Sequence, residues 1–95
     1  MNAVKTIRRR FTVDGIGAVL TLTLVAGKAV EMEVEWDRDR PPRRGGAALA
    51  RYRQLRNTIL AGVADEIGGA VLVVDLEVNG TLIYSTIAPA GEVRT

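Results

Sequence analysis

Residues 7–36 read IRRRFTVDGIGAVLTLTLVAGKAVEMEVEW, and apolar and polar residues alternate in three segments of this stretch. The clearest segment is residues 20–24, in which leucine and threonine alternate. A period of two is typical of a strand that buries one face. Residues 7–13 alternate in the same way, and in residues 30–36 valine, methionine and tryptophan alternate with glutamate. The stretch therefore predicts a three-stranded antiparallel meander within residues 1–36, with Val30 on its inner face.

The turns between these strands predict which residues face each other. Asp14-Gly15 is a favoured two-residue type I′ turn, and it sets Ile7 opposite Leu22, so that apolar side chains meet. For the second turn, a two-residue loop would oppose Leu22 to a glutamate. A three-residue loop at residues 26–28 instead opposes Leu22 to Met32 and keeps the apolar faces together. We therefore expect the longer loop.

The outer face of the meander carries charges of both signs. Arg8 and Arg10 share this face with the glutamates of residues 31–35, and we expect the two kinds of side chain to reach one another across the sheet. Arg9 alternates with them and is expected to point inward, which marks its strand as an edge strand.

The second half of the chain predicts one amphipathic helix over residues 47–68, with apolar side chains at helical spacing. These apolar residues are Leu49, Tyr52, Leu55, Ile59, Leu60, Val63 and Ile67. Pro41-Pro42 exclude an earlier start, because the residue before a proline avoids the helical region. Gly68-Gly69 end the helix in the usual way.

A β-hairpin is predicted over residues 70–88. It turns at Asn79-Gly80, the strongest short hairpin signal, and a two-residue loop there opposes Leu76 to Ile83. The first strand of the hairpin begins with valines and a leucine, so it is apolar on both faces. A strand of this kind is expected at the centre of a sheet.

These elements give the order βββαββ, an α+β fold in which the helix covers one face of an antiparallel or mixed sheet. Ninety-five residues make a single domain that buries roughly 60–65% of its unfolded surface. Its parts are the meander (1–36), a loop rich in proline and arginine (37–46), the helix (47–68), the hairpin (70–88) and a tail (89–95).

The composition offers little for catalysis. The chain has no cysteine and no histidine, and Ser85 is its one serine, so an activated nucleophile has no obvious base. The acids of residues 31–37 lie two apart on a flat strand, without the burial or close partner that a catalytic acid needs. Ligands placed in this way diverge instead of wrapping an ion. We expect no enzyme, no cofactor and no metal site.

Arginines crowd the loop and the start of the helix. The candidate partner-binding residues are Arg38, Arg40, Arg43, Arg44, Arg51, Arg53 and Arg56. The only acid in this stretch is Asp39, although the amino-terminal end of a helix favours acids over bases. Charge placed against that preference indicates an anionic partner, since bidentate arginine recognises carboxylate and phosphate alike. Ordinary solvated charge is the alternative.

Two classes of function follow from this pattern. The first is a small non-catalytic protein that associates stoichiometrically with an acidic protein partner, as accessory and inhibitor proteins of phages and mobile elements do. The second is a weak nucleic-acid-binding protein that uses the same arginines, for which a salt titration is the discriminating experiment. The aromatic content of 4% gives base stacking little support. The sequence leaves the oligomeric state open.

The localisation that we expect is cytoplasmic, because a chain without cysteine fits a reducing compartment. Residues 8–11 followed by the apolar run of residues 16–26 are similar to a twin-arginine export signal. Asp14-Gly15 interrupt that pattern, however, and the Leu–Thr alternation favours a strand. The run is also shorter than the ~20 residues that a membrane-spanning helix needs, so no membrane partner is expected.

Overall fold

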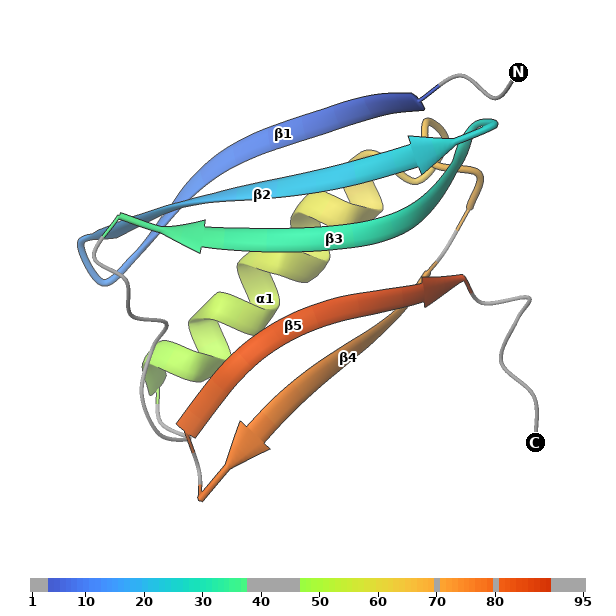
Figure 1. Ribbon diagram of the computed structural model, residues 1–95. Coiled ribbons are helices and arrows are strands. Elements are labelled where there is room, and N and C mark those ends of the chain that lie inside the picture. Colours follow the sequence, from blue (N-terminus) through green and yellow to red (C-terminus); the bar gives the residue numbers. More distant parts are fainter. Residues whose placement is uncertain (1–3, 38–46, 70, 80, 90–95) are drawn as a thin grey trace.

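The computed structural model describes residues 4–37, 47–69, 71–79 and 81–89, and it confirms the βββαββ order (Figure 1). The elements are β1 (Val4–Val13), β2 (Ile16–Val25), β3 (Lys28–Trp36), α1 (Ala47–Gly62), β4 (Val71–Val78) and β5 (Thr81–Pro89). The first three strands form an antiparallel sheet in the order β1-β2-β3, whereas β4 and β5 form a two-stranded sheet of their own. Among the residues that the structure describes, no helix has the length and apolar character required to cross a membrane.

The register of the meander is confirmed at its centre. Ile7 lies opposite Leu22, and Leu22 lies opposite Met32, as the turn chemistry predicts. Asp14 and Gly15 both have positive φ, at 49° and 81°, which is the conformation that a type I′ turn requires. The three paired side chains are buried, so the inner face of this sheet forms one wall of the core.

The second turn differs from the prediction of a three-residue loop. Val25 lies opposite Lys28, which leaves a two-residue loop at Ala26-Gly27, with both residues at positive φ. A bulge then inserts Val30 as an extra residue in β3 and restores the predicted pairing farther along. The prediction that Val30 faces inward is therefore wrong, because it is 45% exposed while its neighbour Ala29 is 1% exposed.

A second bulge changes the hairpin of β4 and β5. Ile83 is an extra residue in β5, so Leu76 lies opposite Tyr84 and not opposite Ile83 as predicted. The same shift places Asp75 opposite Ser85. The prediction of a central position for β4 is also wrong, since in the described part of the chain β4 pairs with β5 alone.

The helix α1 lies behind both sheets and joins them into one core (Figure 1). Tyr52, at 1% exposure, packs its ring 6.2 Å from Phe11 and 5.4 Å from Trp36, measured between ring centroids. The helix ends at Gly62, earlier than predicted, and hydrogen-bonded turns continue the chain to residue 69. Leu55, which we expected in the core, is 37% exposed, whereas the next residue, Arg56, is 5% exposed.

Candidate functional site

The helix arginines are engaged within the fold, beginning with Arg51. Its Nε and Nη2 donate hydrogen bonds of 2.9 and 2.8 Å to the carboxylate of Asp14, in the first turn of the meander. The hydrogen bond from Arg51 lowers the pKa of the Asp14 carboxyl below its ordinary value. Both side chains are about half exposed, so water screens the pair and its contribution to stability is small.

Asp75 on β4 receives two further arginines of the helix. Arg56 donates from Nη1 to both carboxylate oxygens of Asp75, at 2.7 and 2.9 Å, and Arg53 donates from Nε at 3.1 Å. Arg53 also pairs with Glu77, two residues farther along the strand. The Arg56 and Asp75 side chains are only 6% and 12% exposed, so this ion pair lies in the interior of the protein.

Two hydroxyl groups complete this buried network. Ser85 Oγ donates to Asp75 Oδ1 at 2.5 Å, and Tyr52 Oη lies 2.6 Å from Ser85 Oγ. Because the one proton of the serine hydroxyl points to Asp75, the tyrosine hydroxyl is the donor to Ser85. The guanidinium carbon of Arg56 also lies 5.3 Å from the centroid of the Tyr52 ring. The network therefore joins α1 to both strands of the hairpin.

The pKa values of this network follow from its burial and hydrogen bonds. Burial alone would raise the pKa of Asp75, but hydrogen bonds from Ser85, Arg56 and Arg53, together with the charge of Arg56, lower it below its ordinary value. Burial raises the pKa of Tyr52, against the opposing effects of Ser85 and Arg56. Asp75 is thus held as a carboxylate and Tyr52 as a neutral phenol, which suits a structural role.

The seven predicted partner-binding arginines fall into two groups. Arg51, Arg53 and Arg56 direct their guanidinium groups at carboxylates of the same chain. The other four, at positions 38, 40, 43 and 44, lie outside the described residues. The sequence interpretation did not single out Asp75, although Asp75 and Glu77 are two acids inside the otherwise apolar run VLVVDLEV, which is a signal that a basic partner lies nearby.

A surface that the sequence interpretation missed is the outer face of the hairpin. With Asp75 and Glu77 turned toward α1, the alternate residues of β4 point to solvent. This outer hairpin face consists of Leu72, Val74, Leu76, Val78, Ile83 and Tyr84, each between 41% and 55% exposed. It includes no charged side chain. The largest exposed apolar patch on a typical monomer measures ~300–600 Å², and such patches are often functional.

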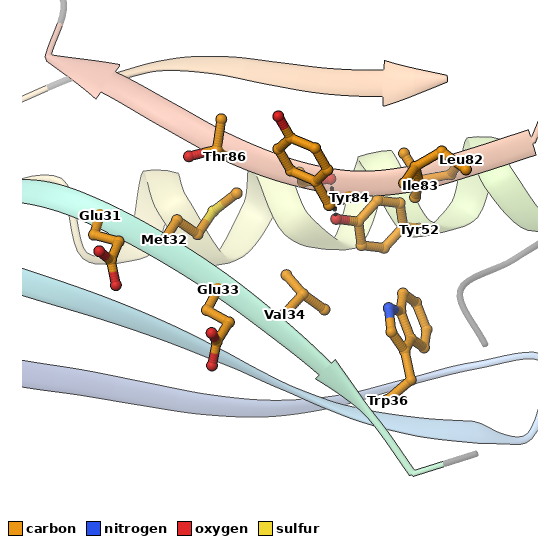
Figure 2. A pocket seen from close by; sticks show the side chains of 11 residues that line it. Glu31, Met32, Glu33, Val34, Trp36, Tyr52, Leu82, Ile83, Tyr84 and Thr86 are labelled. Carbon is orange, nitrogen blue, oxygen red and sulfur yellow. Dashed lines mark hydrogen bonds between the residues drawn. The ribbon is translucent and has the colours of Figure 1, made fainter. Parts of the chain in front are cut away.

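A hollow of about 370 Å³ lies between β3 and β5 (Figure 2), and we name it the β3–β5 slot. Its lining residues are Glu31, Met32, Glu33, Val34, Trp36, Tyr52, Leu82, Ile83, Tyr84, Ser85 and Thr86. Met32, Tyr52 and Leu82 are buried at its floor, whereas Glu31 and Glu33 are exposed at its rim. A second hollow of about 380 Å³ lies between α1 and β4, and the described residues that line it carry no charge.

The charged outer face of the meander differs from the expectation. Arg10 pairs with Asp37 at 2.9 Å, and the part of the chain that the structure describes contains no ion pair between an arginine and Glu31, Glu33 or Glu35. Arg9 is exposed instead of pointing inward, in agreement with the position of β1 at the edge of its sheet. The residues that the structure describes also contain no cluster of acids able to hold a metal ion.

Comparison of the chain with protein-family models, with curated proteins and with solved structures yields no match.

Proposed function

We propose that this protein acts by stoichiometric binding to another protein, without catalysis, and that the outer hairpin face is its docking surface. The observation that carries the proposal is the orientation of β4, whose acids point inward and whose aliphatic side chains point to solvent. Removing water from an exposed apolar patch without charge costs little free energy, and burying the patch against a partner favours binding, as at the centre of a protein interface.

The sequence-based expectation of an acidic partner is part of this proposal. Arg51, Arg53 and Arg56 already have carboxylate partners, so the proposal keeps the arginines at positions 38, 40, 43 and 44, which lie outside the described residues, as candidates for recognising an acidic partner. Charge pairs outside the apolar centre of an interface mainly raise the rate of association. We place this binding in the cytoplasm, in the manner of an accessory or inhibitor protein of a phage or mobile element.

A capture experiment with matched variants tests the proposal. The tagged protein is incubated with extract of its native host, and the bound proteins are identified by mass spectrometry. Replacing Leu72 and Val74 with serine removes apolar surface from the outer hairpin face. Replacing Val4 and Val30 with serine removes exposed valines elsewhere, at 67% and 45% exposure, and serves as the control.

We expect one partner to be lost with the Leu72→Ser/Val74→Ser variant and retained with the control. Equal capture by both variants would place the binding site away from the hairpin. A stable dimer of the purified protein in light scattering would show that a second copy covers the face, and would contradict the heteromeric proposal. Binding of duplex DNA with a linear log–log salt dependence would favour the nucleic-acid alternative.

A further inference from the structure

The outer strand edges of the two sheets differ in how they are protected. β5 lies between β3 and β4 (Figure 1), so the edge of β3 faces β5 across the β3–β5 slot. β1 ends its sheet on the other side, and Arg8, Arg9 and Arg10 along it are exposed. Arg9 also donates from Nη1 to the backbone oxygen of Arg8 at 2.9 Å. Charged side chains of this kind keep another strand from pairing with an edge.

The free edge of β4 lacks this protection. Its sequence, VLVVDLEV, contains no basic residue and no proline. Asp75 and Glu77 point at α1, where Arg53 and Arg56 match their charge. Among the described residues, no backbone hydrogen bond other than those to β5 involves residues 71–78. The edge therefore offers a row of unused backbone donors and acceptors.

The pairing with β5 indicates which backbone groups form this row. Val78 lies opposite Thr81 and closes the two-residue loop, so its N–H and C=O bond to β5. The backbone groups of successive residues alternate in direction along an antiparallel strand. Val74 is therefore turned to β5, whereas Val73 and Asp75 direct their N–H and C=O groups to the free edge.

The hollow of about 380 Å³ between α1 and β4 lies beside the same edge, and we name it the α1–β4 hollow. Asn57, Ala61 and Ala64 line it on the side of the helix, and Val71 and Val73 on the side of β4. No described residue of β5 contributes to the lining, so the hollow lies toward the free edge of β4 and away from the pairing with β5. The volume is within the ~300–1,000 Å³ range of ligand pockets, and the described lining is uncharged.

We propose that the partner adds an extended, uncharged segment as a third strand to the free edge of β4. This inference rests on the proposed function, because it names the way in which the partner reaches the hairpin. Successive side chains of a strand point to opposite faces, so every second side chain of the segment would enter the α1–β4 hollow. The others would lie beside Leu72 and Val74 and extend the outer hairpin face. The eight residues of β4 span roughly 25 Å, which matches a segment of about seven residues.

Charge decides which occupant fits this site. A charged side chain in the α1–β4 hollow would be buried without a partner among the described lining residues, at a high cost in free energy. A second copy of the chain would offer its own β4, whose inner face carries the carboxylates of Asp75 and Glu77. A segment with valine or threonine on both faces meets no such cost and suits the exposed Leu72 and Val74. The occupant is therefore a strand of a different protein.

Hydrogen exchange of the free protein, measured by NMR, tests whether the edge is open. We expect the amides of Val73 and Asp75 to exchange at least about tenfold faster than those of Val74 and Leu76, which bond to β5. Equal protection of all four amides in the monomer would show that the edge is already covered, and would overturn the inference. Protection of Val73 and Asp75 that grows with protein concentration would show that a second copy takes the edge, and would overturn the choice of occupant.

A peptide titration tests the addition of a strand. The probe is a fluorescein-labelled peptide of about seven alternating valines and threonines, flanked by lysines for solubility and followed by anisotropy. Two comparison peptides carry N-methyl groups, one on the valine amides and the other on the threonine amides. An added strand turns only one of these sets of amides to β4, so one methylated peptide should lose at least about tenfold in affinity and the other should stay within about twofold of the probe. The bound probe should also slow the exchange of the Val73 and Asp75 amides.

Variants of α1 connect the binding to the α1–β4 hollow without changing the hairpin. Ala61→Glu places a carboxylate beside the hollow and should weaken binding of the probe at least about fivefold. Ala50→Glu makes the same exchange at another exposed position of the helix and should leave the affinity within about twofold. Circular dichroism checks that both variants keep the fold.

Equal weakening by the two methylated peptides, or by the two helix variants, would overturn the inference. A probe that binds no more tightly than a peptide methylated at every amide would overturn it as well. Capture from host extract separates this inference from the proposed function. Loss of the partner with Leu72→Ser/Val74→Ser but not with Ala61→Glu would leave the docking surface in place and refute the added strand. The reverse result would move the docking site from the outer hairpin face to the edge of β4.

Discussion

Asp75→Asn is the substitution that most directly tests the buried network, because it removes the negative charge and nearly preserves the shape. In the wild type, Arg56 is 5% exposed and directs Nη1 at both oxygens of Asp75. In the variant, the amide presents one acceptor oxygen and a competing NH₂ donor, so the buried guanidinium loses its counter-charge. Breaking a buried ion pair by removing one partner costs about 3–5 kcal/mol.

A loss of that size is a large part of the total stability, which is roughly 5–15 kcal/mol for a domain of this kind. It corresponds to a fall of roughly 12–40 °C in Tm for a chain of this length. Urea and thermal unfolding, both followed by circular dichroism, measure the change. The matched control is Asp14→Asn, which breaks the exposed, solvent-screened pair with Arg51 and should lower the stability far less than Asp75→Asn does.

A double-mutant cycle sharpens the test of the network. Removing the charge of Arg56 as well, in Asp75→Asn/Arg56→Met, leaves no buried cation without a partner, so part of the lost stability should return. Strictly additive effects of the two substitutions would refute the interpretation of a coupled buried pair. A loss for Asp75→Asn no larger than that for Asp14→Asn would refute it as well.

Three further predictions follow from the same geometry. The pKa of Asp75 is lower in the folded protein than its value of ~3.9 in the unfolded chain, so its carboxylate stabilises the fold above pH ~3.9 and loses this effect as the pH falls through the folded pKa. Urea titrations should therefore show the stabilities of the wild type and Asp75→Asn converging below about pH 4. Burial raises the pKa of Tyr52 in the folded protein, so its neutral hydroxyl stabilises the fold below pH ~10 and loses this effect as the pH rises through the folded pKa. In the same titrations, Tyr52→Phe should therefore lose less stability at alkaline pH than the wild type does. Ala26 has a φ of 55° and precedes Gly27, and Ala26→Asn would give the favoured Asn-Gly turn. The midpoint of urea unfolding should rise by the equivalent of ~0.5–1 kcal/mol, whereas an unchanged midpoint would mean that the alanine stores no backbone strain there.

The meander was predictable because two independent signals agree on it. The alternation along residues 20–24 determines which side chains are buried, and the Asp14-Gly15 turn determines the register. A slip by one residue would turn every leucine of β2 to solvent, so the pairing of Ile7 with Leu22 is strongly specified. The order βββαββ follows from the same patterns, together with the prolines and glycines between the elements.

The two bulges could not be predicted from the alternation of apolar and polar residues alone. A bulge adds one residue to one strand, after which the period of two resumes on the opposite face. At Val30 and Ile83 the extra residue is apolar, so the sequence shows no polar residue that would mark it as exposed. Such positions are decided by packing on both sides of the strand and not by the local pattern.

The candidate site was only partly accessible from the sequence for a similar reason. Leu55 and Arg56 are neighbours near the edge of the apolar stripe of the helix, and helical spacing alone favours burial of the leucine. In the structure Arg56 is buried instead of Leu55, because the charge of Asp75, a residue distant in sequence, must be matched inside the fold. The spacing of Arg53 and Arg56 on one helix face, opposite acids two apart on a strand, was a second sequence feature that could have indicated the pairing.

The buried network and the outer hairpin face are consequences of one arrangement. A strand has only two faces, so turning Asp75 toward Arg56 necessarily turns Val74 and Leu76 to solvent. The bulge at Ile83 then brings Ser85 opposite Asp75 and sets Tyr84 beside Leu76. A hairpin selected for stability alone would gain from the opposite orientation, with its aliphatic side chains in the core and its acids in water. The observed orientation forgoes that gain in stability, and this supports the proposal that the outer face of the hairpin binds a partner.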